Sequence, residues 1–406
     1  MNIWCISKYA SPPNYGAGAR LFFLTKEFIK LGHNAILITS DSNHLATFPE
    51  TDKKYNREEI SNVPVYWVKT KKYNKTASIS RILSWLDFEI KLFSFPKNNL
   101  PKPDVVLVSS LSLFSIVYAY YLKKKFRAFL VFEIRDIWPL TMTEEGGFSR
   151  WHPLVLLLGM IEKFGYKHSD LIVGTMPKLD LHIKNVLGYE RRFFCSPLGF
   201  EPDKYKPDID QGKNPFDEMF PSNKIVIGYA GSMGLTNALE PFIGAIELLK
   251  DVSEIHFMLV GGGDLRADFE AKLIGCNNVS FLPRMPQKQV KYFLDKCDIL
   301  YLSTKDSKVW EYGQSMNKVV EYMLAAKPII ASYTGYQSML DEADCGVFIK
   351  TTVPIDVKNA IVNMVNLESP ERIKMGEKGR AWIFSHRQYS VLAKQYIDEI
   401  NKLMII

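Results

Sequence analysis

Short apolar runs alternate with longer amphipathic segments along most of this chain, a pattern typical of strands and helices that follow one another in an α/β fold. The near-continuous apolar runs are those that parallel sheets require, because such strands are buried on both faces. They predict strands at residues 2–7, 35–40, 63–69, 103–110, 129–134, 170–175, 225–230, 255–260, 279–282 and 299–303. The segments between them predict helices at residues 21–31, 79–95, 112–121, 162–168, 239–250, 265–273, 289–296 and 385–406. The polar residues 41–62 predict a loop.

Residues 314–332 form the most informative segment of the pattern. Ser315 is a good N-cap, and no Gly or Pro follows it until Pro328, so the segment predicts a helix of about three turns, a short break and a buried strand. Helical spacing places one set of apolar side chains on a single inward face: Met316, Val319, Val320, Met323 and Leu324.

The polar edge of this predicted helix suits a nucleotide ligand. Asn317 and Glu321 lie one turn apart, and Lys318 lies beside them. The start of a helix presents unpaired N–H groups to an anion such as a phosphate, and a carboxylate in the second turn could accept hydrogen bonds from a ribose diol. An amphipathic helix with Lys318 and Glu321 as a solvated pair remains an equal alternative.

Two strand ends in the first half of the chain offer further candidates. Glu133, Arg135 and Asp136 follow the predicted strand 129–134, and functional groups in open parallel sheets sit at the carboxyl ends of strands. The alternative is a local salt-bridge cluster in a turn. The loop after the first strand contains glycines at 16 and 18 but no G-x-G-x-x-G pattern, so a dinucleotide fingerprint is not supported. This loop is a ligand loop or a plain turn.

The chain of 406 residues is long enough for two or three domains. A Pro- and Gly-bearing polar segment at 207–223 has the composition of a linker, and a second series of βαβ units begins after it. We therefore expect two packed α/β domains whose strand ends face a cleft.

Composition narrows the class of partner. Hydrophobic residues make up 47%, charged residues 23% and aromatic residues 13% of the chain, and the net charge is +7. No nucleic-acid-binding module accompanies this excess, so nucleic acid is not an expected partner, whereas a nucleotide diphosphate or an anionic membrane surface is. Five cysteines without a C-x-x-C pair indicate a reducing, cytoplasmic environment. We expect no signal peptide, no membrane-spanning segment and no metal site.

Several motifs in this order and spacing resemble those of the bacterial family-4 glycosyltransferases of GT-B fold. They are the Gly-bearing loop at 16–20 with its following helix, Arg-Asp-Ile-Trp-Pro at 135–139, Gly-Ser-Met-Gly at 231–234, Gly-Gly-Gly-Asp at 261–264 and Ser-Met-Asn-Lys-Val-Val-Glu at 315–321. The resemblance covers essentially the whole chain. Its closest subgroup is the O-antigen and capsule transferases for N-acetylated amino sugars.

The resemblance implies two Rossmann-like doubly wound domains. An acceptor domain at residues 1–200 would be joined by part of the C-terminal helix 386–406, which crosses back to it, and a donor domain would span residues 201–385. The enzyme would be a retaining, metal-independent transferase that needs no cofactor and uses a nucleotide-diphosphate sugar, UDP-linked, as co-substrate. The acceptor would be a lipid-diphosphate-linked saccharide at the inner face of the cell membrane.

The resemblance also assigns roles to residues. Glu321 matches the second Glu of an E-x7-E motif and would hold the ribose, while Gly313 stands in place of the first Glu. Ser232 and Asn237 lie near the positions of a basic pair that binds diphosphate in the family, which leaves Arg284, Lys305 and Lys318 as candidates for that charge. The implied catalytic residues are Asp136, Arg135 and Glu321. The implied donor-binding residues are Gly16, Gly18, Arg20, Gly231, Ser232, Gly234, Gly261, Arg284, Ser315, Met316, Asn317, Lys318 and Glu321.

Two other classes remain open. Loss of the first Glu is compatible with a binding module without catalysis, and a nucleotide-sugar epimerase of related architecture would need further acid and base groups. The aromatic-rich segment 79–98 and the basic run 123–127 suit a helix at an anionic membrane interface, although core helices of a parallel sheet give a similar pattern.

Overall fold

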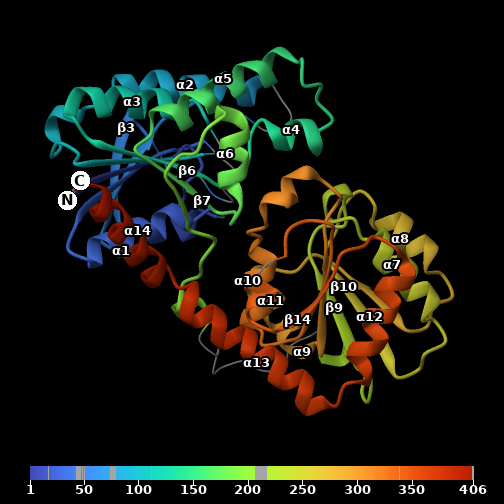
Figure 1. Cartoon of the computed structure of the whole chain (residues 1–406). Coiled ribbons are helices and arrows are strands. Elements are labelled where there is room, and N and C mark those ends of the chain that lie inside the picture. Colours follow the sequence, from blue (N-terminus) through green and yellow to red (C-terminus); the bar gives the residue numbers. More distant parts are fainter. Residues whose placement is uncertain are drawn as a thin grey trace. The chain divides into compact units, whose positions relative to one another are not determined.

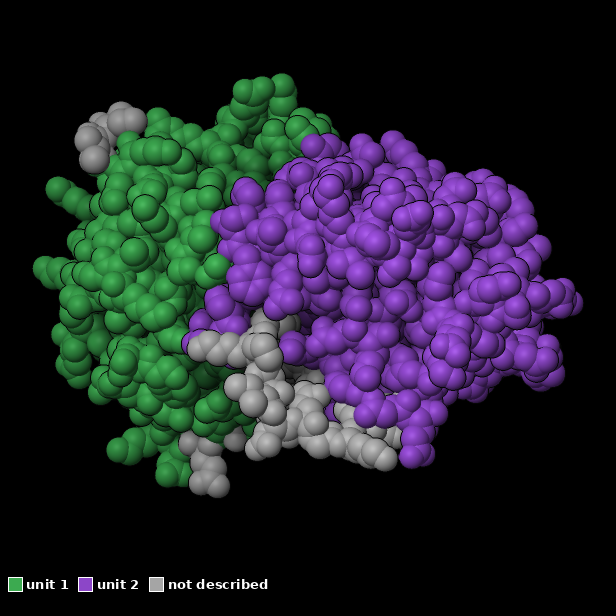
Figure 2. Space-filling model, turned by 90° about the horizontal axis from the view of Figure 1, so that it is seen from below, with its two compact units in different colours: residues 1–199, 387–406 green, residues 200–386 purple. Residues whose placement is uncertain are grey.

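The computed structural model describes residues 1–16, 18–42, 47, 49, 51–73, 79–110, 112–205, 217–337 and 339–404. Residues 207–216 of the predicted linker lie outside this part of the chain. Contacts divide the chain into two units, coloured separately in Figure 2. Unit 1 comprises Met1–Gly199 and Arg387–Ile406, and unit 2 comprises Phe200–His386.

Unit 1 is built on an eight-stranded sheet in the order β3-β4-β2-β1-β5-β6-β7-β8. All neighbouring strands are parallel except the edge pair β3 and β4. The strands are β1 (Asn2–Ile6), β2 (Asn34–Ser40), β3 (Tyr55–Ile60), β4 (Val63–Val68), β5 (Val105–Ser109), β6 (Phe129–Ile134), β7 (Leu171–Gly174) and β8 (Phe193–Cys195).

Helices cover both faces of this sheet (Figure 1). They are α1 (Arg20–Lys30), α2 (Ile79–Phe93), α3 (Ser115–Phe126), α4 (Leu140–Glu144), α5 (Pro153–His168), α6 (Leu179–Leu187) and α14 (Tyr389–Met404). Helix α14 packs on α1, where the ring of Phe28 meets that of Tyr396 edge-on at 5.8 Å. The last helix of the chain is therefore part of the unit 1 core.

Unit 2 is built on a six-stranded parallel sheet in the order β11-β10-β9-β12-β13-β14. Its strands are β9 (Ile225–Ala230), β10 (Ile255–Val260), β11 (Val279–Leu282), β12 (Ile299–Ser303), β13 (Ile329–Ser332) and β14 (Gly346–Ile349). Its helices are α7 (Glu240–Leu248), α8 (Arg266–Lys272), α9 (Gln287–Lys296), α10 (Asn317–Leu324), α11 (Met339–Glu342), α12 (Pro354–Asn366) and α13 (Ser369–His386). The order reverses at β9, and the carboxyl edge of a parallel sheet at such a switch point is where ligands bind.

The prediction of parallel α/β sheets is confirmed, and the bounds predicted for β6, β9, β10, β11 and β12 agree with those observed. The loop predicted at 41–62 is wrong for its second half, because residues 55–60 form β3. This strand reads Tyr-Asn-Arg-Glu-Glu-Ile and pairs antiparallel with β4 at the sheet edge. An edge strand can keep polar side chains in water, so it lacks the apolar run of a central strand.

Candidate functional site

A pocket of about 330 Å³ lies in unit 2 at the carboxyl ends of β9, β10 and β11. Loops after all three strands form its walls, and α9 and α10 each add one side chain. The lining residues are Ala230, Gly231, Ser232, Val260, Gly261, Gly262, Arg284, Met285, Val290 and Glu321. Three glycines among them leave backbone exposed to whatever occupies the pocket.

The two glycine loops touch each other. Gly261 has φ of +140°, and a Cβ placed on it would lie 1.9 Å from the carbonyl oxygen of Gly231. No side chain fits in that space, so glycine at 261 is required by the approach of the β9 loop to the β10 loop. Because both loops line the pocket, a ligand there can contact their backbone atoms directly.

Lys318 brings a positive charge to the β9 loop from the first turn of α10. Its Nζ donates to the hydroxyl of Tyr229 at 3.1 Å and to Oδ1 of Asn237 at 2.9 Å, and it lies 4.4 Å from the centre of the Tyr229 ring. A Cβ on Gly231 would come within 2.9 Å of that Nζ. Burial lowers the pKa of Lys318 to about 8, and the negative charge of Glu321 opposes that shift.

Arg284 brings a second positive charge to the other glycine loop. Its Nε lies 3.0 Å from the place of a Cβ on Gly262, and its side chain lines the pocket. Lys305 is exposed and does not line the pocket. Of the three cations proposed to bind a diphosphate, two therefore lie against the glycine loops.

The start of α10 differs from the sequence prediction. The N-cap position is Met316, not Ser315, and the helix spans 8 residues, not about three turns. Oε1 of the Gln314 side chain accepts a hydrogen bond from the N–H of Met316 at 3.0 Å. Asn317, which opens the helix, is exposed, and Glu321 lines the pocket from the second turn.

The position of the missing first Glu has its own backbone constraint. Gly313 has φ of +103°, a conformation that side-chain-bearing residues rarely adopt. Glycine at this position therefore does two things: it removes the carboxylate of the family motif, and it allows a backbone conformation that glutamate would rarely adopt. Gly234, the other predicted glycine of the β9 loop, precedes a short 3-10 turn at Leu235–Asn237.

In unit 1, Arg135 and Asp136 follow β6 as predicted. Both oxygens of Asp136 accept local hydrogen bonds, from Nε1 of Trp138 at 2.7 Å and from Oγ1 of Thr141 at 2.6 Å. Burial lowers the pKa of Arg135, and the charge of Glu133 opposes that change. The Nε of Arg135 is buried and has no hydrogen-bond partner among the described residues, so a polar group is still available there for a ligand.

Arg20 lies inside unit 1 in a buried ion pair. Its Nη2 donates to Oε2 of Glu133 at 2.9 Å, and both side chains are at most 1% exposed. Burial alone would raise the pKa of Glu133, but Arg20 outweighs it and the pKa falls below its usual value. The guanidinium also donates to the carbonyls of Ser196 and Pro197. In this arrangement Arg20 joins α1 to the segment after β8.

The glycines predicted to flank that arginine lie in the loop between β1 and α1. Gly18 has φ of +97°, and a Cβ there would lie 2.8 Å from the carbonyl oxygen of Tyr9. Gly16 also has a positive φ, of +136°. These two glycines permit a folded loop between β1 and α1.

A buried polar cluster at the carboxyl ends of β1 and β2 escaped the sequence analysis. Lys8 Nζ donates to Oγ of Ser40 at 3.4 Å and to the carbonyl of Ser42 at 2.5 Å. Burial lowers the pKa of Lys8 to about 7, against the opposing charges of Asp41 and Glu89. A lysine directly after a buried first strand was the available signal, because that place is a strand's carboxyl end.

Among the residues that the structure describes, no group of three or more His, Cys, Asp or Glu side chains is arranged to hold a metal. Within the same residues, no helix is both long and apolar enough to cross a bilayer.

Solved structures with the same fold support this description. Sucrose-phosphate synthase from Thermosynechococcus elongatus matches with a TM-score of 0.72 at 13% identity, covering 100% of this chain and 99% of that one. A trehalose-6-phosphate structure from E. coli bound with UDP-2-fluoro glucose matches at 0.71 and 13%, covering 98% of each chain. HepE from Anabaena in complex with UDP and glucose matches at 0.65 and 14%, covering 99% of each. No curated protein matches the chain in sequence.

The fold is the GT-B fold, with two Rossmann-like units. Residues 224–366, which contain the whole pocket, match the family model described as "Glycosyl transferases group 1". The chain is accordingly a glycosyltransferase, an enzyme of class EC 2.4.

Proposed function

We propose that this chain is a retaining, metal-independent transferase that moves an N-acetylated amino sugar from a UDP-linked donor to a lipid-diphosphate-linked saccharide. The reaction would belong to the synthesis of a surface polysaccharide such as O-antigen or capsule. Unit 2 would bind the donor, and Arg135 and Asp136 of unit 1 would bind the acceptor.

The observation that carries the proposal is the composition of the unit 2 pocket. It combines Glu321, Arg284 and exposed glycine backbone in about 330 Å³, with the Nζ of Lys318 directly behind Gly231. A ribose diol donates to a carboxylate, and a diphosphate accepts from cations and backbone N–H groups. One pocket thus offers complementary groups for both polar parts of a nucleotide diphosphate.

The same groups suit the chemistry of transfer. The bond between the sugar C1 and the diphosphate oxygen breaks, and its electron pair remains on the diphosphate. The acceptor hydroxyl bonds to C1 and gives its proton to the departing diphosphate oxygen. Arg284 and Lys318 would stabilise the negative charge that develops on this leaving group, which is the role that a metal ion has in other enzymes.

The choice of UDP is supported by two structures of similar fold, one bound with UDP-2-fluoro glucose and one in complex with UDP and glucose. The amino sugar and the lipid-linked acceptor rest on the resemblance of the sequence motifs. They are the parts of the proposal that a substrate panel must test.

Membrane association would bring the enzyme to such an acceptor. Helix α2 buries Trp85, Phe88 and Leu92 but turns a second apolar face outward, where Ile90 is 70% exposed. The other exposed apolar residues of this helix are Leu83, Leu86 and Phe93. An apolar outer face near Lys91 and the basic end of α3 suits the interface of an anionic bilayer. We propose peripheral binding to the inner face of the cell membrane.

Gly313 favours one alternative, a nucleotide-sugar-binding module without catalysis, because the carboxylate of the first motif Glu is absent. An epimerase of related fold has less support, since Glu321 is the single carboxylate among the described residues that line the pocket.

The test is a panel of UDP-, GDP- and TDP-sugars with a lipid-diphosphate acceptor, read out as nucleotide release and as glycolipid product. The proposal expects acceptor-dependent release from a UDP-sugar, with the anomeric configuration of the donor kept in the product. Tight UDP binding without turnover of any donor would identify the binding module. Interconversion of donors without acceptor would identify the epimerase.

A further inference from the structure

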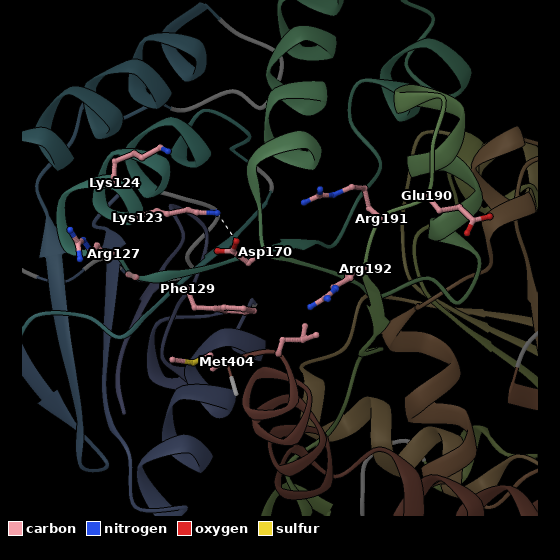
Figure 3. A pocket seen from close by; sticks show the side chains of 11 residues that line it. Lys123, Lys124, Arg127, Phe129, Asp170, Glu190, Arg191, Arg192 and Met404 are labelled. Carbon is pink, nitrogen blue, oxygen red and sulfur yellow. Dashed lines mark hydrogen bonds and ion pairs between the residues drawn. The ribbon is translucent and has the colours of Figure 1, made fainter. Parts of the chain in front are cut away.

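A second hollow lies in unit 1, at the amino ends of β6, β7 and β8 (Figure 3). Its volume is about 890 Å³. The carboxyl ends of the same strands carry Arg135, Asp136 and Thr175, so the groove opens at the opposite edge of the sheet. The lining residues of this basic groove are Lys123, Lys124, Arg127, Ala128, Phe129, Asp170, Glu190, Arg191, Arg192, Leu403 and Met404.

The groove has a strong excess of positive charge. Five of its lining side chains are cationic and two are acidic, and both acids already have partners. Asp170 accepts from Nζ of Lys123 at 2.6 Å and from the N–H of Leu130 at 2.8 Å. Glu190 accepts from Lys184, outside the groove, at 2.9 Å. The acids therefore leave the charges of the arginines uncompensated.

Arg191 has donor capacity that the described residues do not use. Its Nη2 donates to the carbonyl of Ser169, while its Nε is buried without a hydrogen-bond partner among the described residues. A buried donor without a partner is costly unless a ligand or water meets it. Arg127 and Arg192 are exposed on either side of the groove. A guanidinium presents its N–H groups in a fork that matches phosphate oxygens.

His168, the last residue of α5, lies within the field of these positive charges. Burial lowers its pKa, and nearby positive charges lower it further. Those charges belong to Lys167, Lys123, Lys124 and Arg191. An anion that enters the groove should offset them and raise the pKa of His168.

We propose that the basic groove is a binding site for a diphosphate or another multivalent phosphate group, separate from the donor pocket. Free diphosphate and the phosphate headgroup of a lipid share this chemistry. The side chains of Phe129, Leu403 and Met404 line one part of the groove and leave room for an apolar portion of the ligand. All residues that line this site belong to unit 1, and the proposal does not depend on the proposed transferase reaction.

The test uses the full chain and the imidazole NMR signal of His168, assigned by its loss in His168→Gln. Inorganic diphosphate is added at a series of pH values. The expected result is a saturable rise in the pKa of His168. His168 does not line the groove, but its carbonyl accepts a hydrogen bond from Nζ of Lys123, which does, so its signal reports on the unit 1 groove and not on the unit 2 pocket.

The affinity for diphosphate is compared between two triple variants, each of which loses three positive charges. The groove variant combines Lys124→Gln, Arg127→Asn and Arg192→Gln, with Asn chosen because residue 127 has φ of +57°, which Asn tolerates. The control variant replaces exposed lysines outside the groove by Gln, at Lys102, Lys250 and Lys374. We expect diphosphate affinity to fall about tenfold in the groove variant, because three exposed cation contacts are lost. The control variant should bind as the wild type does.

Vesicles of phosphatidylcholine with and without phosphatidic acid distinguish the two sources of phosphate. Sedimentation that requires phosphatidic acid, and that the groove variant loses while the control keeps it, assigns the site to a lipid headgroup. A response of His168 to diphosphate without such sedimentation assigns it to a free phosphate compound. No response to either probe, or equal responses of the two triple variants, overturns the proposal.

Discussion

Replacement of Lys318 by Met tests the electrostatics of the donor pocket most directly. The substitution keeps a long, unbranched side chain against the Tyr229 ring and removes the cation that lies beside Gly231. A charge-assisted hydrogen bond contributes about 1.5–3 kcal/mol, so UDP should bind roughly 10- to 150-fold more weakly. The melting temperature should not fall, because burial already disfavours the charged form of Lys318 in the folded state.

The same residue predicts a pH dependence with a definite sign. A lysine whose pKa is lowered to about 8 is cationic below that pH and neutral above it. Its charged fraction falls from about 90% at pH 7 to about 10% at pH 9, so UDP affinity should decrease by about tenfold over this range. The phosphates of UDP lose their last proton at roughly pH 6 and do not contribute. Glu321 opposes the shift, so Glu321→Gln should move the midpoint to lower pH.

Isothermal titration calorimetry of UDP binding from pH 6.5 to 9.5 measures all of these effects. Lys305→Met is the matched control, because it removes an exposed cation that does not line the pocket. It should leave both the affinity and its pH profile unchanged. Wild-type affinity in Lys318→Met, or a flat profile in the wild type, would refute the assignment of Lys318 to the diphosphate.

Four further outcomes follow from the site and the surface. Glu321→Ala should weaken donor binding by roughly 2–4 kcal/mol without loss of thermal stability, and calorimetry showing normal donor affinity would exclude its ribose role. Asp136→Asn should reduce turnover strongly with nearly unchanged UDP affinity; an equally active variant would mean that Asp136 only holds Trp138 and Thr141 in place. Turnover should survive EDTA, and recovery by added Mg²⁺ or Mn²⁺ after a loss would contradict metal independence. Ile90→Glu should reduce flotation with acidic liposomes, and flotation equal to the wild type would remove α2 from the membrane interface.

Central strands were predictable because parallel sheets bury both of their faces. Strands β9, β10 and β12 therefore appear in the sequence as mostly apolar runs, and each run meets a glycine or a serine at its carboxyl end. The pocket lies at the carboxyl ends of these strands, where ligands of parallel sheets bind, and the glycine loops directly follow β9 and β10. Glu321 could be placed one turn into a helix from spacing alone.

Other features depend on contacts between distant segments and had no local signal. The partner of Arg20 is 113 residues away in sequence, so its buried ion pair could not be read from the loop around it. Lys318 meets Asn237 across 81 residues, and only the folded unit 2 shows which cation lies behind Gly231. The N-cap of α10 lies one residue later than predicted, at Met316, whose N–H donates to the side chain of Gln314.

The placement of α14 in unit 1 has a consequence for synthesis of the chain on the ribosome. Leu21, Leu24 and Phe28 of α1 share a core with Tyr396 and Ile400 of α14, yet residues 200–386 are made between these two helices. At about 5–20 residues per second this takes roughly 10–40 s. Unit 2 can thus complete its sheet while the first unit still exposes an apolar surface. The usual order, in which the segment that emerges first is also the first to finish folding, is therefore reversed in this chain.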